Sequence, residues 1–490
     1  MKLRKILKNI NYELIQGSLD INIKDLSYDS RKVKKDYAFI ALIGIDADGH
    51  NYINSAIENG ATCIIICKDI KVNIDKNITI IKINNTRTEL SYLSANFFNN
   101  PQDKLIKIAI TGTKGKTSIS WMIKQILETN QDKVGIIGTV GTYINNKLYP
   151  HKNTTPESYQ IQKFMNIMVK NNVKYLIMET SSQALKVGRV NNILFDYSIF
   201  TNLSNDHIGP REHPTYEDYL NSKAKLFTQS KIGILNNDDK EYNKLITNST
   251  CQIYTYGTNN NSNVKINNIT YLNEKNFFGT SFKLTGLIND TFKVKAPGKF
   301  SSYNATAAIT LCKLLNIKED IIKKGLETFQ VDGRCEILNI DERFKVIIDF
   351  AHNKLSIESI IETMKQYKHN RIITILGCGG GRSKEIRFEL GETVGKLSDL
   401  SIITTDNPRN DNIDDINKDI ENGVKKANGN YIIIKDRKKA IEYALDNAQE
   451  NDIILLLGKG HETYQEIKDK KYPFNEKKII NNYQKNKLGG

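Results

Sequence analysis

The stretch that most constrains the fold is LIKIAITGTKGKTS, residues 105–118. Its first six residues are mostly apolar and read as a buried parallel strand, and the residues after the glycines have apolar side chains at helical spacing. A strand that ends in glycines and opens into a helix at Gly-Lys-Thr is typical of a phosphate-binding loop, because backbone N–H groups and a helix N-terminus attract anions. This pattern predicts an α/β nucleotide-binding domain built on a parallel sheet.

The residues of a phosphate-binding loop have distinct expected roles. Lys116 is expected to reach the terminal phosphate of ATP and Thr117 to bind Mg²⁺. The loop is shorter than the common form, because Ile110 stands where the first glycine is usual. The alternative is a plain glycine turn beside a surface lysine. The residues predicted to contact ATP here are Gly112, Thr113, Lys114, Gly115, Lys116, Thr117 and Ser118.

Length and charge narrow the class of protein. A chain of 490 residues is long enough for about three domains. The net charge of +15 is spread along the chain without a basic block, so we interpret it mainly as compositional bias that is compatible with an anionic substrate; a basic ATPase acting on nucleic acid stays an alternative. The six cysteines form no CxxC pair, and no 18-residue apolar run or signal peptide occurs. We therefore expect a cytoplasmic protein with reduced thiols and no membrane insertion.

Residues 1–100 read as a small α/β domain with short strands, and the polar stretch around Pro101 reads as a linker. Within this domain Ser30 lies in an Asp-Ser-Arg triplet, where a hydroxyl could contact a base edge. Such a triplet is more often a turn that caps a helix.

In the next segment, polar residues follow buried strands. Glu179 ends the strand YLIMET and His207 follows the strand FDYSIF, so both should reach the same sheet edge as Thr117. Oxygen and nitrogen ligands beside a phosphate suit Mg²⁺. The structural alternative is that His207 is a turn residue whose hydrogen bonds are satisfied within the protein. Residues 250–300 predict a β-rich insert, and Asn304 lies early in the helix that follows, where its amide can face an adenine.

In the remaining chain, residues 332–490, the same pattern occurs five times: an apolar strand is followed directly by polar residues or glycine. This arrangement is typical of a doubly wound, Rossmann-like parallel sheet with its site at the carboxyl edge. Arg334 follows a turn near the start of this segment and could reach across to phosphates. The polar residues after the strands include Asp349, His352, Arg382, Asp406, Arg409, Asp436, Gly458 and Glu462.

Seven motifs in fixed order, TGTKGKTS, NTTPES, METSSQAL, FTNLSNDHIG, DFAH, DNPR and GKGHETYQ, cover almost the whole chain. Together they resemble the Mur ligases, and among them the ligases that add an amino acid to UDP-N-acetylmuramoyl-L-alanyl-D-glutamate. The resemblance implies a UDP-binding domain at 1–100, an ATP-binding domain at 101–331 and an amino-acid-binding domain at 332–490. It implies a monomeric enzyme of peptidoglycan synthesis that forms an amide through an acyl phosphate, with ATP and small-molecule substrates.

The resemblance also implies roles for single residues. Lys116, Lys223 and His207 would be catalytic, with Lys223 carrying CO₂ as a carbamate near a metal; the plain interpretation of Lys223 is a solvated helix face. Two Mg²⁺ ions would be held by Thr117, Glu179, His207 and the Lys223 carbamate. The implied further contacts to ATP are Asn304, Arg334 and Asp349, and those to the muramoyl-dipeptide nucleotide are Ser30, Asn153, Thr154, Thr155, Ser182 and Arg189.

The DNPR motif implies that the added amino acid is meso-2,6-diaminopimelate. Arg409 could pair with the distal carboxylate of that substrate, which L-lysine lacks, so an unpaired arginine would discriminate against lysine. L-Lysine, another diamino acid, and a ligase of the folylpolyglutamate synthetase type remain alternatives. The pocket implied for diaminopimelate consists of Arg387, Asp406, Asn407, Arg409, Gly458 and Glu462, and the chain departs from the usual residues at Lys114, Gln183 and Val187.

Overall fold

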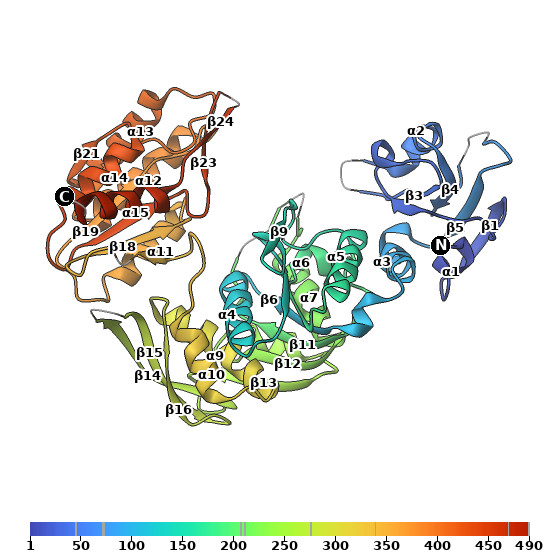
Figure 1. Ribbon diagram of the computed structural model, residues 1–490, viewed down its shortest axis with the longest axis horizontal. Helices are drawn as coiled ribbons and strands as arrows, with labels where there is room; N and C mark the ends of the chain where they lie inside the picture. Colours follow the sequence, from blue (N-terminus) through green and yellow to red (C-terminus); the bar gives the residue numbers. More distant parts are fainter. Residues whose placement is uncertain are drawn as a thin grey trace. The chain divides into compact units, whose positions relative to one another are not determined.

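The computed structural model describes residues 1–44, 47–70, 74–205, 208–209, 212–274, 277–338, 340–468 and 470–488 (Figure 1). The chain forms two compact units. The first consists of residues 1–266, 285–289 and 304–325, and the second of residues 267–284, 290–303 and 326–490. Within the described chain, none of the helices combines the length and apolar character needed to cross a bilayer.

The first unit begins with a five-stranded sheet in the order β1-β5-β4-β3-β2. Only β1 runs antiparallel to its neighbour; the other pairs are parallel. The helices bury their apolar residues against this sheet, which gives the small α/β fold expected for the N-terminal segment. The elements are α1 (Leu3–Ile6), β1 (Tyr12–Gln16), β2 (Asp25–Ser27), β3 (Tyr37–Ile40), α2 (Ile53–Glu58), β4 (Ala61–Ile66), β5 (Thr79–Ile83) and α3 (Thr86–Phe97).

A second sheet in the same unit carries the order β13-β12-β11-β6-β10-β7-β8-β9. Strands β13 to β7 in this order are parallel, and β8 and β9 continue antiparallel. The strands are β6 (Ile106–Thr111), β7 (Val134–Gly138), β8 (Gly141–Ile144), β9 (Lys147–Tyr149), β10 (Tyr175–Glu179), β11 (Phe195–Phe200), β12 (Ser230–Asn236) and β13 (Gln252–Gly257). The helices are α4 (Lys116–Thr129), α5 (Ser158–Lys170), α6 (Ser182–Lys186), α7 (Tyr216–Ala224) and α8 (Tyr242–Ile246). The expected strand before the phosphate-binding loop is therefore present as β6, at the centre of a parallel sheet.

The β-rich insert expected at 250–300 is also present. It contains β14 (Val264–Asn273), β15 (Phe278–Gly286) and β16 (Asp290–Val294), and β15 pairs antiparallel with β16. Helices α9 (Lys299–Leu314) and α10 (Glu319–Glu327) follow. Helix α9 begins at Lys299, so Ser301 lies inside its first turn, where its hydroxyl donates to Pro297 O at 2.6 Å.

The second unit contains a six-stranded sheet in the order β17-β18-β22-β19-β20-β21. All pairs are parallel except β17 with β18. Alternate residues of the strands face two separate cores, one covered by α11, α12 and α13 and the other by α14 and α15. The expected doubly wound, Rossmann-like sheet is confirmed.

The strands of this unit are β17 (Glu336–Leu338), β18 (Lys345–Asp349), β19 (Ile372–Leu376), β20 (Leu400–Ile403), β21 (Tyr431–Ile433) and β22 (Ile453–Leu457). A separate hairpin pairs β23 (Tyr464–Ile467) with β24 (Lys470–Pro473). The helices are α11 (Lys354–Met364), α12 (Lys384–Leu397), α13 (Ile413–Lys426), α14 (Arg437–Asp446) and α15 (Glu476–Leu488).

Helices α12 and α13 pack backbone against backbone through buried glycines. A Cβ atom on Gly391 would lie 2.0 Å from the carbonyl oxygen of Ile420, and one on Gly423 would lie 2.1 Å from that of Phe388. Real Cβ atoms do not approach this closely. The two helices, which flank the DNPR segment in the sequence, are thus held at a fixed and short separation.

Candidate active site

The loop between β6 and α4 has the backbone of a phosphate-binding loop. Gly112 and Gly115 have φ values of +144° and +89°, which favour glycine. A Cβ on Gly112 would lie 1.9 Å from Thr201 Oγ1, and one on Gly115 would lie 2.6 Å from Asn304 Oδ1. Both glycines are therefore required sterically as well, and the Asn304 side chain lies against the loop.

Side chains hold this loop in place. Lys116 Nζ donates to the carbonyl oxygens of Gly112 and Thr113 at 2.8 and 3.0 Å. The N–H of Lys114 donates to Asn202 Oδ1 at 3.0 Å, and Thr113 N donates to Asn202 O at 2.8 Å. The loop is thus fastened to the segment after β11, and Lys116 lies directly over it.

Thr117 and Glu179, predicted from separate strand ends, are in contact. Thr117 Oγ1 donates to Glu179 Oε2 at 2.9 Å, and Glu179 is only 1% exposed. Thr139, which follows β7, donates to the same carboxylate oxygen at 2.9 Å and was missed by sequence reasoning. Its position at the carboxyl end of a parallel strand was a signal that could have found it.

Oxygen donors therefore converge where Mg²⁺ was expected. A buried carboxylate whose recorded partners are neutral hydroxyls and an amide suits a divalent cation. His207 lies outside the described residues. Among the residues that the structure describes, no group of three or more His, Cys, Asp or Glu forms a metal site.

Lys223 occupies a buried position at the phosphate-binding loop. It is 2% exposed, its Nζ donates to Gly112 O at 3.0 Å, and it lies 4.5 Å from the centre of the Tyr219 ring. Lys225, two residues on, is exposed. The interpretation of Lys223 as part of a solvated helix face is therefore wrong.

The NTTPES segment lies next to Glu179. Thr155 Oγ1 donates to Glu179 O at 2.8 Å, and the hydroxyls of Thr154 and Thr139 are 3.2 Å apart. Asn153 is exposed and its carbonyl oxygen lies 2.7 Å from His151 Nδ1. Thr154 and Thr155 thus border the Thr117–Glu179 pair, and Asn153 directly precedes them in the chain.

The other two predicted substrate contacts on this sheet are engaged in polar networks. Arg189 Nη1 donates to Thr155 O at 2.9 Å, and its Nη2 lies 3.0 Å from Glu157 Oε1, which also binds Arg87 of α3 at 2.9 Å. This contact ties the first sheet domain to the second.

Ser182 lies 2.9 Å from Nε2 of His213, a histidine that is 1% exposed. The other ring nitrogen of His213 lies 2.6 Å from Asp218 Oδ2. Burial lowers the pKa of His213 below its ordinary value, although Asp218 opposes this shift.

A pocket of about 650 Å³ opens beside Ser30 in the N-terminal sheet domain. Ser30 is buried, and the side chain of Asp29 caps its turn by accepting from Arg31 N. The Arg31 guanidinium is paired with Asp29 at 2.9 Å. The capped-turn interpretation of the triplet is thus correct, and the same turn also lines a pocket. The lining residues are Tyr28, Asp29, Ser30, Arg31, Phe39, Leu42, Gly44, Ala47, Gly49, Tyr52, Ser55 and Arg87.

Arg334 and Asp349 belong to the second unit. Asp349 accepts the N–H groups of Cys335 and Ala351, both at 2.7 Å, and burial raises its pKa. The Arg334 guanidinium lies 5.0 Å from the centre of the Phe350 ring. Each residue is therefore fixed at the carboxyl end of β18.

A small polar pocket of about 140 Å³ lies at the carboxyl edge of the second unit's sheet. Five of the six residues expected to bind diaminopimelate line it, together with six others: Phe350, His352, Gly377, Cys378, Gly379, Arg382, Asp406, Asn407, Arg409, Gly458 and Glu462. Arg387 is not one of these lining residues. It is buried, and its guanidinium is paired with Asp411 and, at 3.3 Å, with Asp419.

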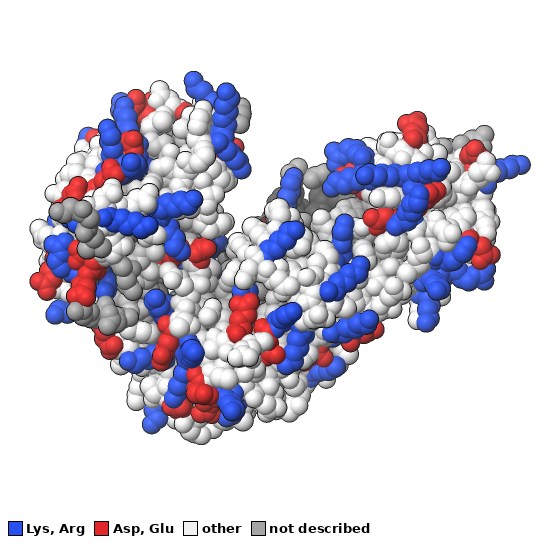
Figure 2. Space-filling model, viewed as in Figure 1, with Lys and Arg blue, Asp and Glu red and all other residues white. Residues whose placement is uncertain are grey.

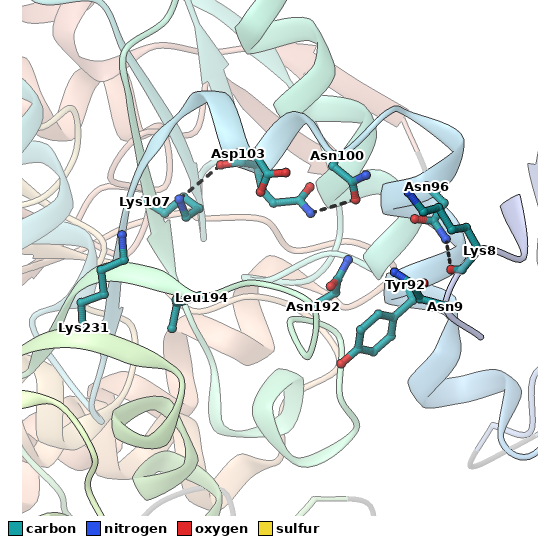
Figure 3. Close-up of a pocket in the computed structure, with 11 residues that line it drawn as sticks. Lys8, Asn9, Tyr92, Asn96, Asn100, Asp103, Lys107, Asn192, Leu194 and Lys231 are labelled. Carbon is teal, nitrogen blue, oxygen red and sulfur yellow. Dashed lines mark hydrogen bonds between the residues drawn. The ribbon is translucent and has the colours of Figure 1, made fainter. Parts of the chain in front are cut away.

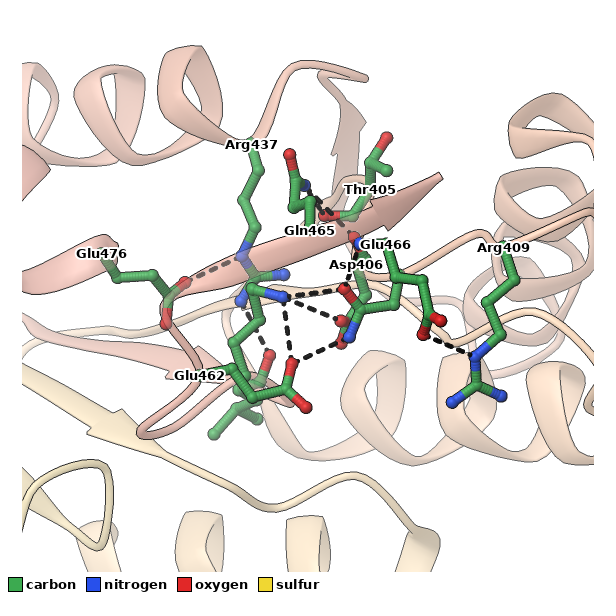
Figure 4. A network of polar contacts seen from close by, with 11 residues as sticks. Thr405, Asp406, Arg409, Arg437, Glu462, Gln465, Glu466 and Glu476 are labelled. Atoms are coloured by element: carbon green, nitrogen blue, oxygen red, sulfur yellow. Dashed lines mark hydrogen bonds and ion pairs between the residues drawn. The ribbon is translucent and has the colours of Figure 1, made fainter. Parts of the chain in front are cut away.

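The pocket residues form a connected polar network (Figure 4). Lys459, which sequence reasoning did not single out, is fully buried and donates to Asn407 Oδ1 and Glu462 Oε2, both at 3.1 Å. Asn407 Nδ2 donates to Glu462 Oε2 at 2.8 Å. Arg409 has a φ of +50°, and its Nε lies 3.2 Å from Glu466 Oε2 on β23. The hairpin β23–β24 is thereby fastened to the DNPR segment.

Another large cavity, of about 560 Å³, lies at the opposite, amino edge of the second sheet (Figure 3). Two of its lysines, Lys107 and Lys231, both pair with Asp196, at 2.9 and 2.7 Å. Because one carboxylate serves both ammonium groups and the cavity lies away from the phosphate-binding loop, we do not assign it to the reaction.

Family models match three segments of the chain. The "Mur ligase family, catalytic domain" matches residues 22–100, the "Mur ligase middle domain" residues 110–312, and the "Mur ligase, glutamate ligase domain" residues 333–460.

Named relatives match over nearly the full length. A UDP-N-acetylmuramoyl-L-alanyl-D-glutamate--2,6-diaminopimelate ligase from Caldanaerobacter subterraneus subsp. tengcongensis is 41% identical and covers 98% of both chains. Ligase 1 of the same name from Clostridium acetobutylicum is 39% identical and covers 99% of both chains. A solved structure of a ligase with this name has a TM-score of 0.76 at 25% identity and covers 100% of this chain and 99% of that chain.

Proposed function

The chain belongs to the Mur ligase family, and from that premise we propose that it adds meso-2,6-diaminopimelate to UDP-N-acetylmuramoyl-L-alanyl-D-glutamate. The observation that carries this proposal is the pairing of full-length similarity to ligases of that name with a polar pocket lined by Asp406, Asn407 and Arg409. The enzyme consumes ATP and supplies a tripeptide nucleotide for peptidoglycan synthesis.

The reaction activates a carboxylate. The γ-phosphate of ATP is transferred to the side-chain carboxylate of the D-glutamate residue, which yields ADP and an acyl phosphate. The neutral amine of diaminopimelate then attacks the acyl carbon, and an amide bond forms as the acyl C–O bond to phosphate breaks. Inorganic phosphate leaves with the bonding electrons, and the attacking nitrogen releases one proton to solvent. The protein mainly positions the groups and balances their charge.

We assign the phosphate-binding loop, residues 112–118, and Asn304 to ATP, with Arg334 and Asp349 as further contacts from the second unit. Lys116 binds the γ-phosphate, because its ammonium lies over the phosphate-binding loop, where it donates to the carbonyl oxygens of Gly112 and Thr113. Support for Asn304 comes from its contact with Gly115.

Thr117 and Glu179 would hold Mg²⁺, which supplies neutralisation of the phosphate charge when bound. His207 and a carbamate on Lys223 are proposed for a second Mg²⁺. The burial of Lys223 beside Gly112 O supports this assignment, because a desolvated lysine is more readily converted to a neutral or anionic form.

The muramoyl-dipeptide nucleotide is assigned to Ser30 and its pocket and to Asn153, Thr154, Thr155, Ser182 and Arg189. Diaminopimelate is assigned to Asp406, Asn407, Arg409, Gly458 and Glu462, which line the small pocket, and Arg387, which does not line it, is proposed as a further contact on the resemblance alone. We propose three functional domains, 1–100, 101–331 and 332–490, in a monomeric cytoplasmic enzyme without nucleic acid as a partner.

The proposal is tested by following phosphate release and product mass with ATP, the muramoyl-dipeptide nucleotide and either meso-diaminopimelate or L-lysine. We expect kcat/KM for diaminopimelate to exceed that for lysine by at least about 100-fold. Equal use of both amines would remove the specificity, and no ADP formation with all substrates present would overturn the activity. Release of ADP with a folate and glutamate instead would favour the folylpolyglutamate synthetase alternative.

Arg409 gives a sharper test of amine choice. Replacing it with alanine removes a charged hydrogen-bond donor, so kcat/KM for diaminopimelate should fall by about 10- to 150-fold, the range expected for 1.5–3 kcal/mol. The value for L-lysine should change less, because lysine has no distal carboxylate to lose a partner. An equal fall for both amines would show that Arg409 does not select the substrate.

A further inference from the structure

We propose that Lys459 is a positioning residue of the diaminopimelate pocket: it fixes the orientation of Asn407 and balances the charges of Asp406 and Glu462. This inference rests on the proposed function. Lys459 follows β22 directly after Gly458, and its side chain has 0% exposed surface. A buried ammonium must have partners, and those of Lys459 are pocket residues.

The first consequence concerns the amide of Asn407. Lys459 Nζ and the N–H of Glu466 both donate to Asn407 Oδ1, at 3.1 and 3.0 Å. Two donors on one atom identify it as the oxygen, so the amide nitrogen faces Glu462, to which it donates at 2.8 Å. An amide nitrogen carries two hydrogens. With one bound to Glu462, Asn407 offers the other to a carboxylate of the substrate.

The second consequence concerns charge. Lys459 Nζ lies 3.1 Å from Glu462 Oε2 and 3.6 Å from Asp406 Oδ1, and Asp406 is 7% exposed. One ammonium between two carboxylates leaves a single net negative charge, which complements one substrate ammonium. Arg382 and Arg409 line the same pocket and complement a carboxylate. Without Lys459 both carboxylates would lose the ammonium that lies between them.

The base from which Lys459 extends is rigid. Arg437 is 1% exposed, its Nη2 donates to Leu457 O at 2.8 Å, and its Nε binds Glu476 Oε1 at 2.8 Å. Gly458 has a φ of +104°, and a Cβ there would lie 2.5 Å from Asp406 Oδ2. Since the end of β22 is held by these buried contacts, Lys459 connects the pocket residues to the sheet.

The experiment compares the purified full-length enzyme with Lys459→Met, which keeps the side-chain length but removes the charge and the donors. We expect the KM for diaminopimelate to rise at least tenfold, while the KM values for ATP and the muramoyl-dipeptide nucleotide and the saturated kcat change less than threefold. Lys459→Gln, which keeps a donor without the charge, should give an intermediate KM. Lys425→Met is the matched control, because Lys425 is 55% exposed and pairs with Glu421 of the same helix, α13.

A double-mutant cycle tests the charge balance itself. The quantity compared is the fold-increase in the KM for diaminopimelate relative to the wild type. If Lys459 compensates Glu462, the increase in the double variant Lys459→Met/Glu462→Gln should be at least threefold smaller than the product of the increases in the two single variants. An unchanged diaminopimelate KM in Lys459→Met, additive single effects, or equal changes in the KM of all three substrates would each overturn the inference. If Lys459→Met does not melt cooperatively, the same cycle is run with Lys459→Gln and decides by the same criteria.

The two proposals fail separately. If the wild-type enzyme forms no product with diaminopimelate, both the proposed function and the role of Lys459 are overturned. A wild-type enzyme that does form product, beside a Lys459→Met variant with unchanged kinetics, overturns only the role of Lys459.

Discussion

Lys223 combines burial with a position at the phosphate-binding loop, and both bear on its proposed carbamate. Its Nζ is 3.0 Å from Gly112 O and the residue is 2% exposed. We expect Lys223→Ala to lower kcat/KM by at least about 100-fold, as loss of a group near a metal does. Added formate or acetate should restore part of the activity, because a small carboxylate can occupy the space of the lost carbamate.

The control for this rescue is Lys225→Ala, a change at the exposed neighbouring lysine, which should neither lose activity nor respond to formate. Retention of more than a tenth of the wild-type activity by Lys223→Ala would contradict the assignment. If the variant loses activity and neither formate nor acetate restores any of it, Lys223 acts as an uncarbamylated ammonium with a structural role.

Single residues of the site were predictable where they ended parallel strands. Thr117 and Glu179 were expected to meet because both follow central strands, and their 2.9 Å contact confirms this. Thr139 and Lys459 were missed because a threonine and a lysine in glycine-rich loops look like ordinary surface residues in a sequence. The burial of Lys459 is set by partners that lie up to 53 positions away in the chain, at Asp406. Only the resemblance, and no local pattern, pointed to the role of Lys223.

At the scale of elements, His213 links α6 to α7 through Ser182 and Asp218. Burial lowers its pKa in the folded protein, so between the ordinary value near 6.5 and the lower folded value the unfolded chain binds more protons. The stabilisation by neutral His213 is therefore complete above about pH 6.5 and is lost as the pH falls through that window. We expect the Tm of the wild type to fall more between pH 7.5 and 5.5 than that of His213→Gln.

His369→Gln, which removes a histidine from the second unit, serves as the control and should retain the wild-type pH dependence of Tm. Identical pH profiles for the wild type and His213→Gln would show that His213 does not contribute to the acid sensitivity of folding.

The glycine contact between α12 and α13 predicts a steric effect. In Gly423→Ala the new methyl would lie 2.1 Å from Phe388 O, so the helices must separate. We expect the free energy of unfolding to fall by about 2 kcal/mol, within the range for overpacked cores. Urea unfolding followed by circular dichroism measures this change. Lys418→Ala at an exposed position of the same helix should leave the midpoint nearly unchanged, and an equal effect of both variants would contradict the argument.

Most elements around the site were predictable from apolar runs, including β6 and the five parallel strands of the second unit. The reversal of the chain between β7 and β8, which pair antiparallel, was not predicted. The turn consists of Thr139 and Val140, and apolar residues continue on both sides of it and hide it in the sequence.

At the scale of the whole molecule, the charge of +15 raises the question of nucleic acid. Figure 2 shows Lys and Arg interspersed with Asp and Glu over the visible face rather than gathered in one block. We expect duplex DNA to bind with a Kd weaker than about 1 μM at 150 mM salt, in the range of non-specific association. Fluorescence anisotropy across a salt series measures this, and tight, salt-resistant binding would revive the nucleic-acid alternative.

The order of the motifs predicted three α/β domains, and the family matches agree with that organisation. The boundaries at residues 100 and 331 stay predictions. By contrast, no sequence pattern indicated that residues 267–284 and 290–303 of the β-rich insert belong to the compact unit of the C-terminal sheet. That grouping depends on packing between segments far apart in the chain, which hydrophobic periodicity does not encode.

Arg409 shows how the backbone of one residue bears on enzyme engineering. Its left-handed conformation is one that asparagine and glycine adopt with less strain than arginine. Exchanging arginine for glycine or asparagine would therefore relax the main chain and alter the group offered to the incoming amine, at the cost of the contacts to Gly380 and Glu466. Libraries aimed at unnatural amino-acid building blocks would therefore include glycine and asparagine at position 409 and vary Glu466 together with it, because Arg409 also fastens the β23–β24 hairpin.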